Sequence, residues 1–133
     1  MSKVRYNDVN KRDKYQAIGD FYEIISNLNS KKESIDFFIG LLTPSEALML
    51  ARRIQIGKRI LEGKKYDEIR KELKVGFSTI TKTENWIHGG SDKYSKWIEG
   101  CLRKNMKKKK TKEHFKGLLD KYPGHRILKN ILN

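Results

Sequence analysis

Apolar residues recur every three or four positions along most of the chain, and no stretch alternates in the way that a strand does. This spacing predicts a first helix over about 13–28 and a shorter second helix over about 35–42. The chain has only two prolines, Pro44 and Pro123, and both fall at boundaries of predicted helices. We therefore expect an all-α fold.

The third predicted helix carries the strongest end signals. Thr43 can cap its N-terminus, Pro44 suits the first helical position, and Glu46 completes a capping box with Thr43. Gly63 is placed to end the helix in a left-handed conformation. One apolar stripe is predicted along this helix, made of Ala47, Leu50, Ala51, Ile54, Gly57 and Leu61.

Two short helices follow, over about 66–73 and about 78–87, with a tight turn between them. Their inward positions are Tyr66, Ile69, Leu73, Ile80 and Ile87. The turn is Lys74–Val75–Gly76, where Gly76 is expected to take the positive φ that other residues avoid. This order indicates a helix-turn-helix, whose second helix can enter the major groove of DNA.

A sixth helix is predicted over about 92–102, with Tyr94, Trp97, Ile98, Cys101 and Leu102 on one face. Residues 1–12 are predicted to be a flexible, polar N-terminus, and residues 13–102 are predicted to form one domain. Seven of the ten residues 103–112 are Lys or Arg, which predicts a solvated basic linker. Apolar residues return at helical spacing in 113–133, so we expect a helical tail there.

The charge balance points to a polyanionic partner. Thirty Lys and Arg against 16 Asp and Glu give a net charge of +14, of which residues 103–133 contribute +9. A basic excess attracts polyanions without regard to sequence, so nucleic acid is the leading partner and an anionic membrane surface is the alternative. The apolar content of 37% is low, which hints that a partner subunit completes the core.

The sequence offers no pattern for catalysis, metal binding or membrane insertion. His88, His114 and His125 are scattered without metal-ligand spacing, and no phosphate-binding loop is present. We therefore expect no enzyme activity, metal or cofactor. A single cysteine, Cys101, excludes an internal disulfide and fits a reducing compartment. The chain shows no signal peptide and no apolar run of membrane-spanning length, so we expect a cytoplasmic protein.

The second helix of the helix-turn-helix presents short polar side chains outward. They are Ser78, Thr79, Thr81, Lys82 and Asn85. Hydroxyl and amide groups can bond base edges, and a threonine methyl can pack on a thymine methyl. Arg70, Lys71 and Lys74 lie on the preceding helix and turn, where phosphate contacts usually fall. The alternative interpretation is two solvated helices with ordinary charged faces.

Several motifs occur in register: LTPSE at 42–46, Arg53, Glu62–Gly63, Tyr66 with Ile69, Glu72–Leu73 and GFSTITKTENWI at 76–87. With these motifs, about residues 15–102 resemble the Trp-repressor superfamily, and more closely its YerC/YecD type. The resemblance implies a six-helix fold in an intertwined homodimer, whose reading helices lie about 34 Å apart and grip successive major grooves of a near-palindrome. It also implies that Phe77, Ser78 and Thr81 face bases, and that Arg70, Lys71 and Thr79 lie near the backbone.

The same resemblance implies an effector pocket between the third helix and the reading helix, where an arginine on each helix sandwiches free tryptophan. Arg53 matches the first arginine, but Lys82 replaces the second, so a planar stacking group becomes a point charge. Thr83 stands in place of a glycine and Trp86 in place of a serine. We therefore predict that free tryptophan is not the effector. Trp86 could fill the pocket and fix the reading helices, or it could simply pack in the core.

Taken together, these patterns predict a sequence-specific, double-stranded DNA-binding transcriptional regulator, a repressor that acts as a homodimer without free tryptophan. Two alternatives stay open: a basic helical module that binds RNA or a protein, and a repressor gated by a different small molecule. The basic segment 103–112 either lies along the flanking DNA backbone or is a solvated spacer.

Overall fold

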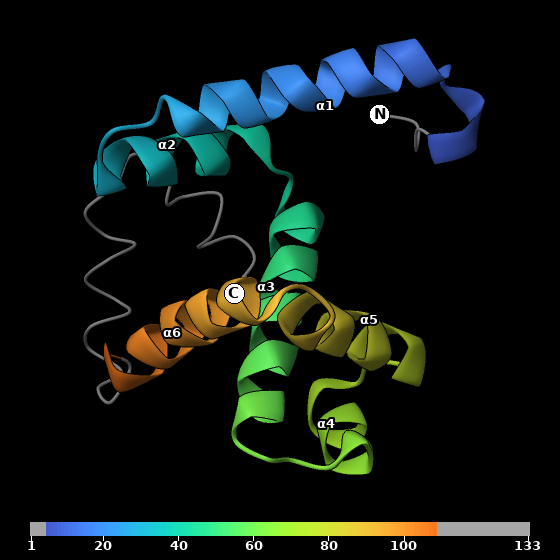
Figure 1. Ribbon diagram of the computed structural model, residues 1–133, viewed down its shortest axis with the longest axis vertical. Coiled ribbons are helices and arrows are strands. Elements are labelled where there is room, and N and C mark those ends of the chain that lie inside the picture. Colours follow the sequence, from blue (N-terminus) through green and yellow to red (C-terminus); the bar gives the residue numbers. More distant parts are fainter. Residues whose placement is uncertain (1–4, 109–133) are drawn as a thin grey trace. The chain divides into compact units, whose positions relative to one another are not determined.

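The computed structural model describes residues 5–108, in which six α-helices and a short 3-10 helix form and no strand occurs (Figure 1). The elements are η1 (Tyr6–Asp8), α1 (Lys11–Ser26), α2 (Lys31–Leu41), α3 (Pro44–Leu61), α4 (Tyr66–Leu73), α5 (Phe77–His88) and α6 (Asp92–Lys108). The all-α prediction is confirmed. The predicted tail over 113–133 lies outside the described residues. The chain separates into two compact units between Leu41 and Leu42.

The first unit contains α1 and α2, and both helices begin earlier than their apolar spacing predicts, because polar caps lie upstream. The Asn10 side chain accepts a hydrogen bond from the Asp13 N–H at 2.9 Å. The Ser30 hydroxyl accepts from the Glu33 N–H at 3.1 Å, and the Glu33 carboxylate accepts from the Asn29 N–H at 2.7 Å. Neither helix contains a buried residue.

The second unit opens with α3, whose predicted capping box is confirmed. The Thr43 hydroxyl accepts from the Glu46 N–H at 3.2 Å, and the Glu46 carboxylate accepts from the Thr43 N–H at 2.9 Å. The backbone bond from Thr43 holds the pKa of Glu46 below its ordinary value. This stabilisation is therefore present above the ordinary pKa of a glutamate and is lost as the pH falls through the lowered one. Gly63 ends the helix with a φ of 80°, as predicted.

Two apolar clusters form the core of the second unit. The first consists of Ile56, Ile69, Leu73 and Ile80, which join α3, α4 and α5. The second consists of Ile87, Ile98 and Leu102, which join α5 to α6. At Gly57 of α3, an added Cβ atom would lie 3.1 Å from Ile87 Cδ1 and 3.3 Å from Leu102 Cδ1. The absence of a side chain there lets α5 and α6 both approach α3 closely.

The predicted apolar stripe of α3 is only partly right. Gly57 is buried, but so are Ile56 and Lys58, which the stripe did not include. Leu50 and Ile54 remain 38% and 42% exposed, because α4, α5 and α6 bury only the C-terminal half of α3. The second unit by itself leaves Leu48, Met49 and Leu50 in the N-terminal half of α3 exposed.

The turn between α4 and α5 differs from the prediction. Lys74, which caps the C-terminus of α4, takes the left-handed conformation at φ 54° and ψ 49°. Gly76 is extended, with a φ of −82°, because it is the N-cap of α5. The prediction that Gly76 supplies the positive φ is therefore wrong. The chain reverses at the end of α4, two residues earlier.

The last described helix, α6, continues to Lys108, so the first six residues of the predicted basic linker are helical. The C-terminal part of α6 packs against the rest of the second unit. Leu102 is buried, Met106 is half-buried, and the Lys58 ammonium donates a hydrogen bond to the Asn105 side chain. Lys58 itself is only 7% exposed, so this contact fixes α6 on α3 beyond the apolar cluster.

Candidate nucleic-acid interface

Helix α5 exposes the row of polar side chains that the sequence predicts for a reading surface. Ser78, Thr79, Thr81, Lys82 and Asn85 are all exposed. They share one helix with Ile80, Thr83 and Ile87, which are buried. The helix is therefore fixed by its inner face and free to present hydroxyl, amide and ammonium groups on its outer face.

The inner face of α5 contains one polar side chain, Thr83, which is 3% exposed. Its hydroxyl donates a hydrogen bond of 2.8 Å to the carbonyl oxygen of Thr79, one turn earlier on the same helix. A buried hydroxyl would be costly without such a partner. Because this bond uses its donor, Thr83 contributes packing and a satisfied polar group to the site.

Helix α4 and the turn place three cations next to the start of α5. Arg70, Lys71 and Lys74 are exposed, as predicted for phosphate contacts. The Arg70 guanidinium lies 4.9 Å from the centre of the Phe77 ring, and Phe77 is 43% exposed. This cation–π contact holds Arg70 at the N-terminus of α5. Gly76 caps that terminus without a side chain over its first-turn N–H groups.

An ion pair holds α4 against α3. Arg59 Nε and Nη2 lie 3.0 Å and 2.7 Å from Glu72 Oε1, and Arg59 Nη1 lies 3.3 Å from Glu62 Oε1. The hydrogen bond that Arg59 donates to Glu72 raises the pKa of Arg59 above its ordinary value. The pair is partly exposed, so it orients the helix-turn-helix more than it stabilises the fold.

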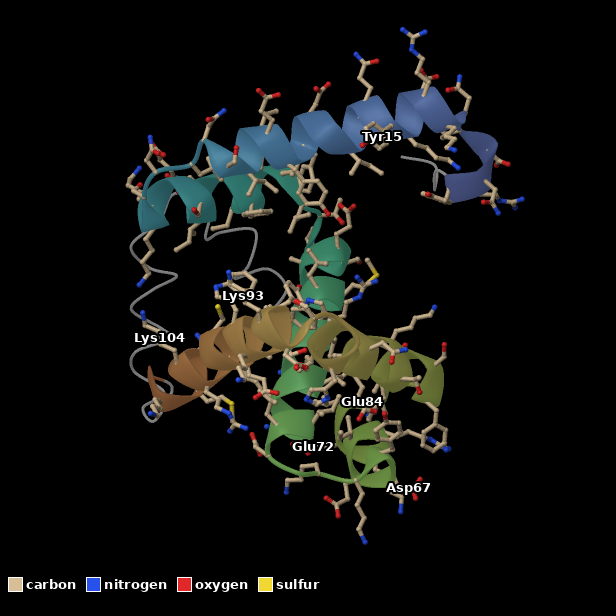
Figure 2. All side chains as sticks on the ribbon, in the orientation of Figure 1. Tyr15, Asp67, Glu72, Glu84, Lys93 and Lys104 are labelled. Carbon is tan, nitrogen blue, oxygen red and sulfur yellow. The ribbon has the colours of Figure 1, made fainter. Side chains whose placement is uncertain are left out.

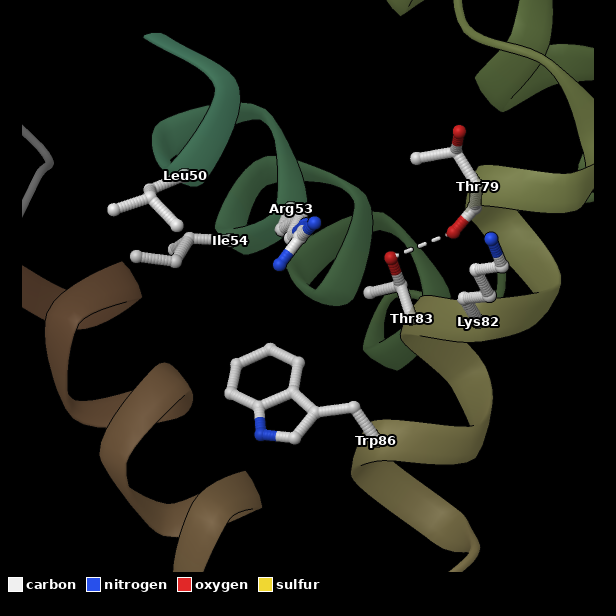
Figure 3. A pocket seen from close by; sticks show the side chains of 7 residues that line it. All are labelled: Leu50, Arg53, Ile54, Thr79, Lys82, Thr83 and Trp86. Carbon is white, nitrogen blue, oxygen red and sulfur yellow. Dashed lines mark hydrogen bonds between the residues drawn. The ribbon is translucent and has the colours of Figure 1, made fainter. Parts of the chain in front are cut away.

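A hollow of about 640 Å³ lies between α3 and α5 (Figure 3). Its lining consists of Leu50, Arg53, Ile54, Thr79, Lys82, Thr83 and Trp86. All four residues predicted for an effector pocket or its remnant, Arg53, Lys82, Thr83 and Trp86, are thus brought together. The side chains of Leu50 and Ile54 supply apolar wall, and the two cations supply positive charge.

Trp86 links three helices at one end of this hollow. Its indole Nε1 donates a hydrogen bond of 2.9 Å to the Tyr94 hydroxyl of α6. Its ring also covers Gly57, since an added Cβ atom there would lie 3.6 Å from Trp86 Cζ3. Figure 3 shows the indole beside the open space, so Trp86 borders the hollow of the single chain rather than filling it.

Comparison with known proteins places this arrangement in a family. The model of the Trp repressor protein family matches residues 16–102, which run from within α1 to within α6. The chain belongs to the Trp repressor family. It is 27% identical over 79 residues to the uncharacterized protein YerC of Bacillus subtilis, covering 59% of this chain and 76% of that protein. No solved structure matched the chain.

A second relative of this Trp repressor family member is the Trp operon repressor homolog of Aliivibrio fischeri (strain MJ11). The two are 27% identical over 95 residues, which cover 71% of this chain and 88% of that protein. The Trp repressor family is a family of DNA-binding regulators rather than of enzymes. Residues 5–108 contain no group of acidic, histidine or cysteine side chains that could hold a metal ion. None of the helices described is long and apolar enough to cross a membrane.

Three contributors to this Trp repressor-like site were missing from the predicted set. Tyr94 had been placed only on the apolar face of α6, yet its hydroxyl accepts the Trp86 hydrogen bond. Its position eight residues after Trp86, across the Gly89–Gly90 break, gives no sequence signal for that contact. Leu50 and Ile54 were predicted as core, whereas they form the apolar wall of the hollow.

Proposed function

We propose that this member of the Trp repressor family binds double-stranded DNA at a specific sequence, as a homodimer, and represses transcription there. The exposed polar row of α5 carries the proposal. It stands on a buried base of Ile80 and Ile87 and has Arg70 fixed at its start, which gives base-reading groups with phosphate-binding cations beside them.

The homodimer part of the proposal is supported by apolar side chains that the single chain leaves uncovered. Leu48, Met49 and Ile54 on α3 are 51%, 53% and 42% exposed, and Trp97 on α6 is 60% exposed. Helices α1 and α2 bury no residue. Ordering such helices costs conformational entropy that burial of apolar surface must offset, and a second copy of the chain would supply that burial.

Selection from a pool of random duplexes with the purified full-length protein tests this function. We expect enrichment of near-palindromes whose half-site centres lie about 10 base pairs apart, because two identical reading helices dock one DNA turn apart. If the selection enriched no sequence, the proposal of sequence-specific binding would be wrong. Preferential retention of RNA competitor would favour instead the alternative of a basic RNA-binding module.

We further propose that DNA binding does not require free tryptophan. Two residues of the hollow support this. Trp86 already joins α5 to α6 through its bond to Tyr94, and Lys82 presents a point charge where indole stacking would need a plane. The remaining space beside Arg53 and Lys82 supports one alternative, in which another small anion with an apolar body binds there and controls a repressor.

Removing the indole should therefore weaken DNA binding, and adding free tryptophan to the unaltered protein should not strengthen it. For Trp86→Ser we expect affinity for the selected duplex to fall about tenfold, because the reading helix loses a hydrogen bond and an aromatic contact. Tyr94→Phe is the matched variant: it keeps the ring and removes only the acceptor, so its loss should be smaller. Fluorescence anisotropy with a labelled duplex measures each affinity. Unchanged binding by Trp86→Ser, or a tryptophan requirement in the unaltered protein, contradicts the proposal.

A further inference from the structure

Four exposed lysines share one side of α6, away from the helix-turn-helix. They are Lys93, Lys96, Lys104 and Lys107. At about 100° of rotation per residue, the four fall within an arc of about 80°. We call this set the α6 cationic face; Figure 2 labels two of its members along the helix.

Acidic residues do not neutralise this face. The two acidic residues of α6, Asp92 and Glu99, lie about 40° or more outside the arc on a helical wheel. Glu99 is engaged elsewhere, with Oε1 3.2 Å from His88 Nε2. Within the described residues, none of the four lysines takes part in an ion pair.

The opposite side of α6 determines where the cationic face points. Ile98 and Leu102 are buried against α5 and α3, and they lie about 160–200° around the helix from the centre of the arc. Asn105 adds the hydrogen bond from Lys58. These contacts turn the cationic face outward on a helix that is fixed in place, so the lysines form a surface distinct from the outer row of α5.

Helix stability accounts for only part of this arrangement, because the helix dipole favours cations near the C-terminal end, where Lys104 and Lys107 lie. Lys93 lies in the first turn, where the helix dipole disfavours a cation, and the pairs Lys93–Lys96 and Lys104–Lys107 set like charges three residues apart. At position 93, a neutral side chain of similar helix propensity would be better for the isolated helix. A bound polyanion would offset the unfavourable position of Lys93 and the repulsion within the two lysine pairs.

We propose that the α6 cationic face binds the phosphate backbone of double-stranded DNA without sequence preference, as a second contact besides α5. Lys93 to Lys107 spans about 21 Å of helix at a rise of about 1.5 Å per residue. Each strand of a duplex carries one phosphate for about every 3.4 Å of its axis, so a duplex segment of this length carries more than enough phosphates to pair with four lysines. The choice of DNA rests on the proposed function of α5. In sequence, Lys109, Lys110 and Lys112 extend the same charge.

The test replaces the four lysines by glutamine in the full-length protein: Lys93→Gln, Lys96→Gln, Lys104→Gln and Lys107→Gln. The probe is a random-sequence duplex, titrated over a range of salt concentrations. Each lost phosphate contact lowers the slope of log affinity against log salt by about 0.9, so we expect a fall of about 2–4. A charge-matched control, Arg5→Gln with Lys11→Gln, Arg12→Gln and Lys31→Gln, changes the same net charge in the first unit and should alter the slope by less than about 1.

The outcomes separate this inference from the proposed function. If the α6 variant keeps the slope of the unaltered protein, the inference is overturned, whether or not a selected duplex is still preferred. If the slope falls while no duplex is ever preferred over random sequence, the sequence-specific function fails and the α6 contact stands. The affinity of each variant is also measured for vesicles of phosphatidylcholine with phosphatidylserine and for duplex RNA. An α6 variant that loses affinity for either of these but not for DNA also overturns the inference. Circular dichroism of each variant checks that helix content is retained.

Discussion

Replacing Ser78 and Thr81 together by alanine should lower affinity for the selected duplex by about 30-fold to 10⁴-fold. Both side chains are exposed on α5, beside buried Ile80, so the variant should keep its fold. Removing a hydroxyl that bonds a base edge leaves the base group without a partner in the interface, which costs about 1–3 kcal/mol, and every 1.4 kcal/mol is about tenfold. Affinity for a random duplex should change little, because phosphate contacts supply it.

Anisotropy titrations of the selected and the random duplex, side by side, measure this ratio. Thr79→Ala is the control on the same helix. Thr79 is exposed and expected near the backbone, so its loss should weaken both titrations alike. Equal losses on both duplexes for the Ser78 and Thr81 variant would mean that these hydroxyls contact phosphates, and base reading would have to lie elsewhere.

The second large effect is on stability. Ile80→Ala should lower the free energy of unfolding by about 2–5 kcal/mol, because the side chain is fully buried and its removal leaves a cavity that neighbours fill only partly. Those neighbours are Ile56, Ile69 and Leu73, the contacts that hold α4 and α5 on α3. The milder Ile80→Val should cost about 0.5–1.5 kcal/mol.

Urea unfolding followed by circular dichroism measures these differences, at one protein concentration because a dimer's stability depends on it. Thr81→Ala, the adjacent exposed position, serves as the control and should stay within about 0.5 kcal/mol of the unaltered protein. Equal stability of the alanine variants at 80 and 81 would show that the cluster around Ile80 does not hold the helix-turn-helix together.

Local signals predicted most of the helix boundaries. Thr43, Pro44 and Glu46 located the start of α3 to the residue, and α4 matched its predicted range because apolar spacing and flanking polar residues agree there. Such signals act over one helical turn and can be seen in the sequence. Where α1 and α2 began early, the caps at Asn10 and Ser30 were themselves local, but the apolar spacing alone did not include them.

What the sequence could not predict depends on neighbours distant in the chain. Ile56 is buried and Ile54 is exposed on the same helix, because burial follows where α4, α5 and α6 cross α3. The positive φ fell on Lys74 instead of Gly76, since the point of reversal is decided by how α4 and α5 pack. Within the site, helical periodicity found the α5 row. The hydrogen bond between Trp86 and Tyr94 could not be predicted, because it depends on the angle between α5 and α6, and helical periodicity gives no such angle.

The bond from Lys58 to Asn105 affects where the basic C-terminal region can be cut. A protein ending at Leu102 would lose residues 103–108 of α6, and with them the hydrogen bond between Asn105 and the nearly buried Lys58. If such a protein bound DNA more weakly, a loosened α6 would explain the loss as well as missing phosphate contacts would. A protein ending after Lys108 keeps every described residue of α6, so any change in its salt dependence belongs to the removal of residues 109–133.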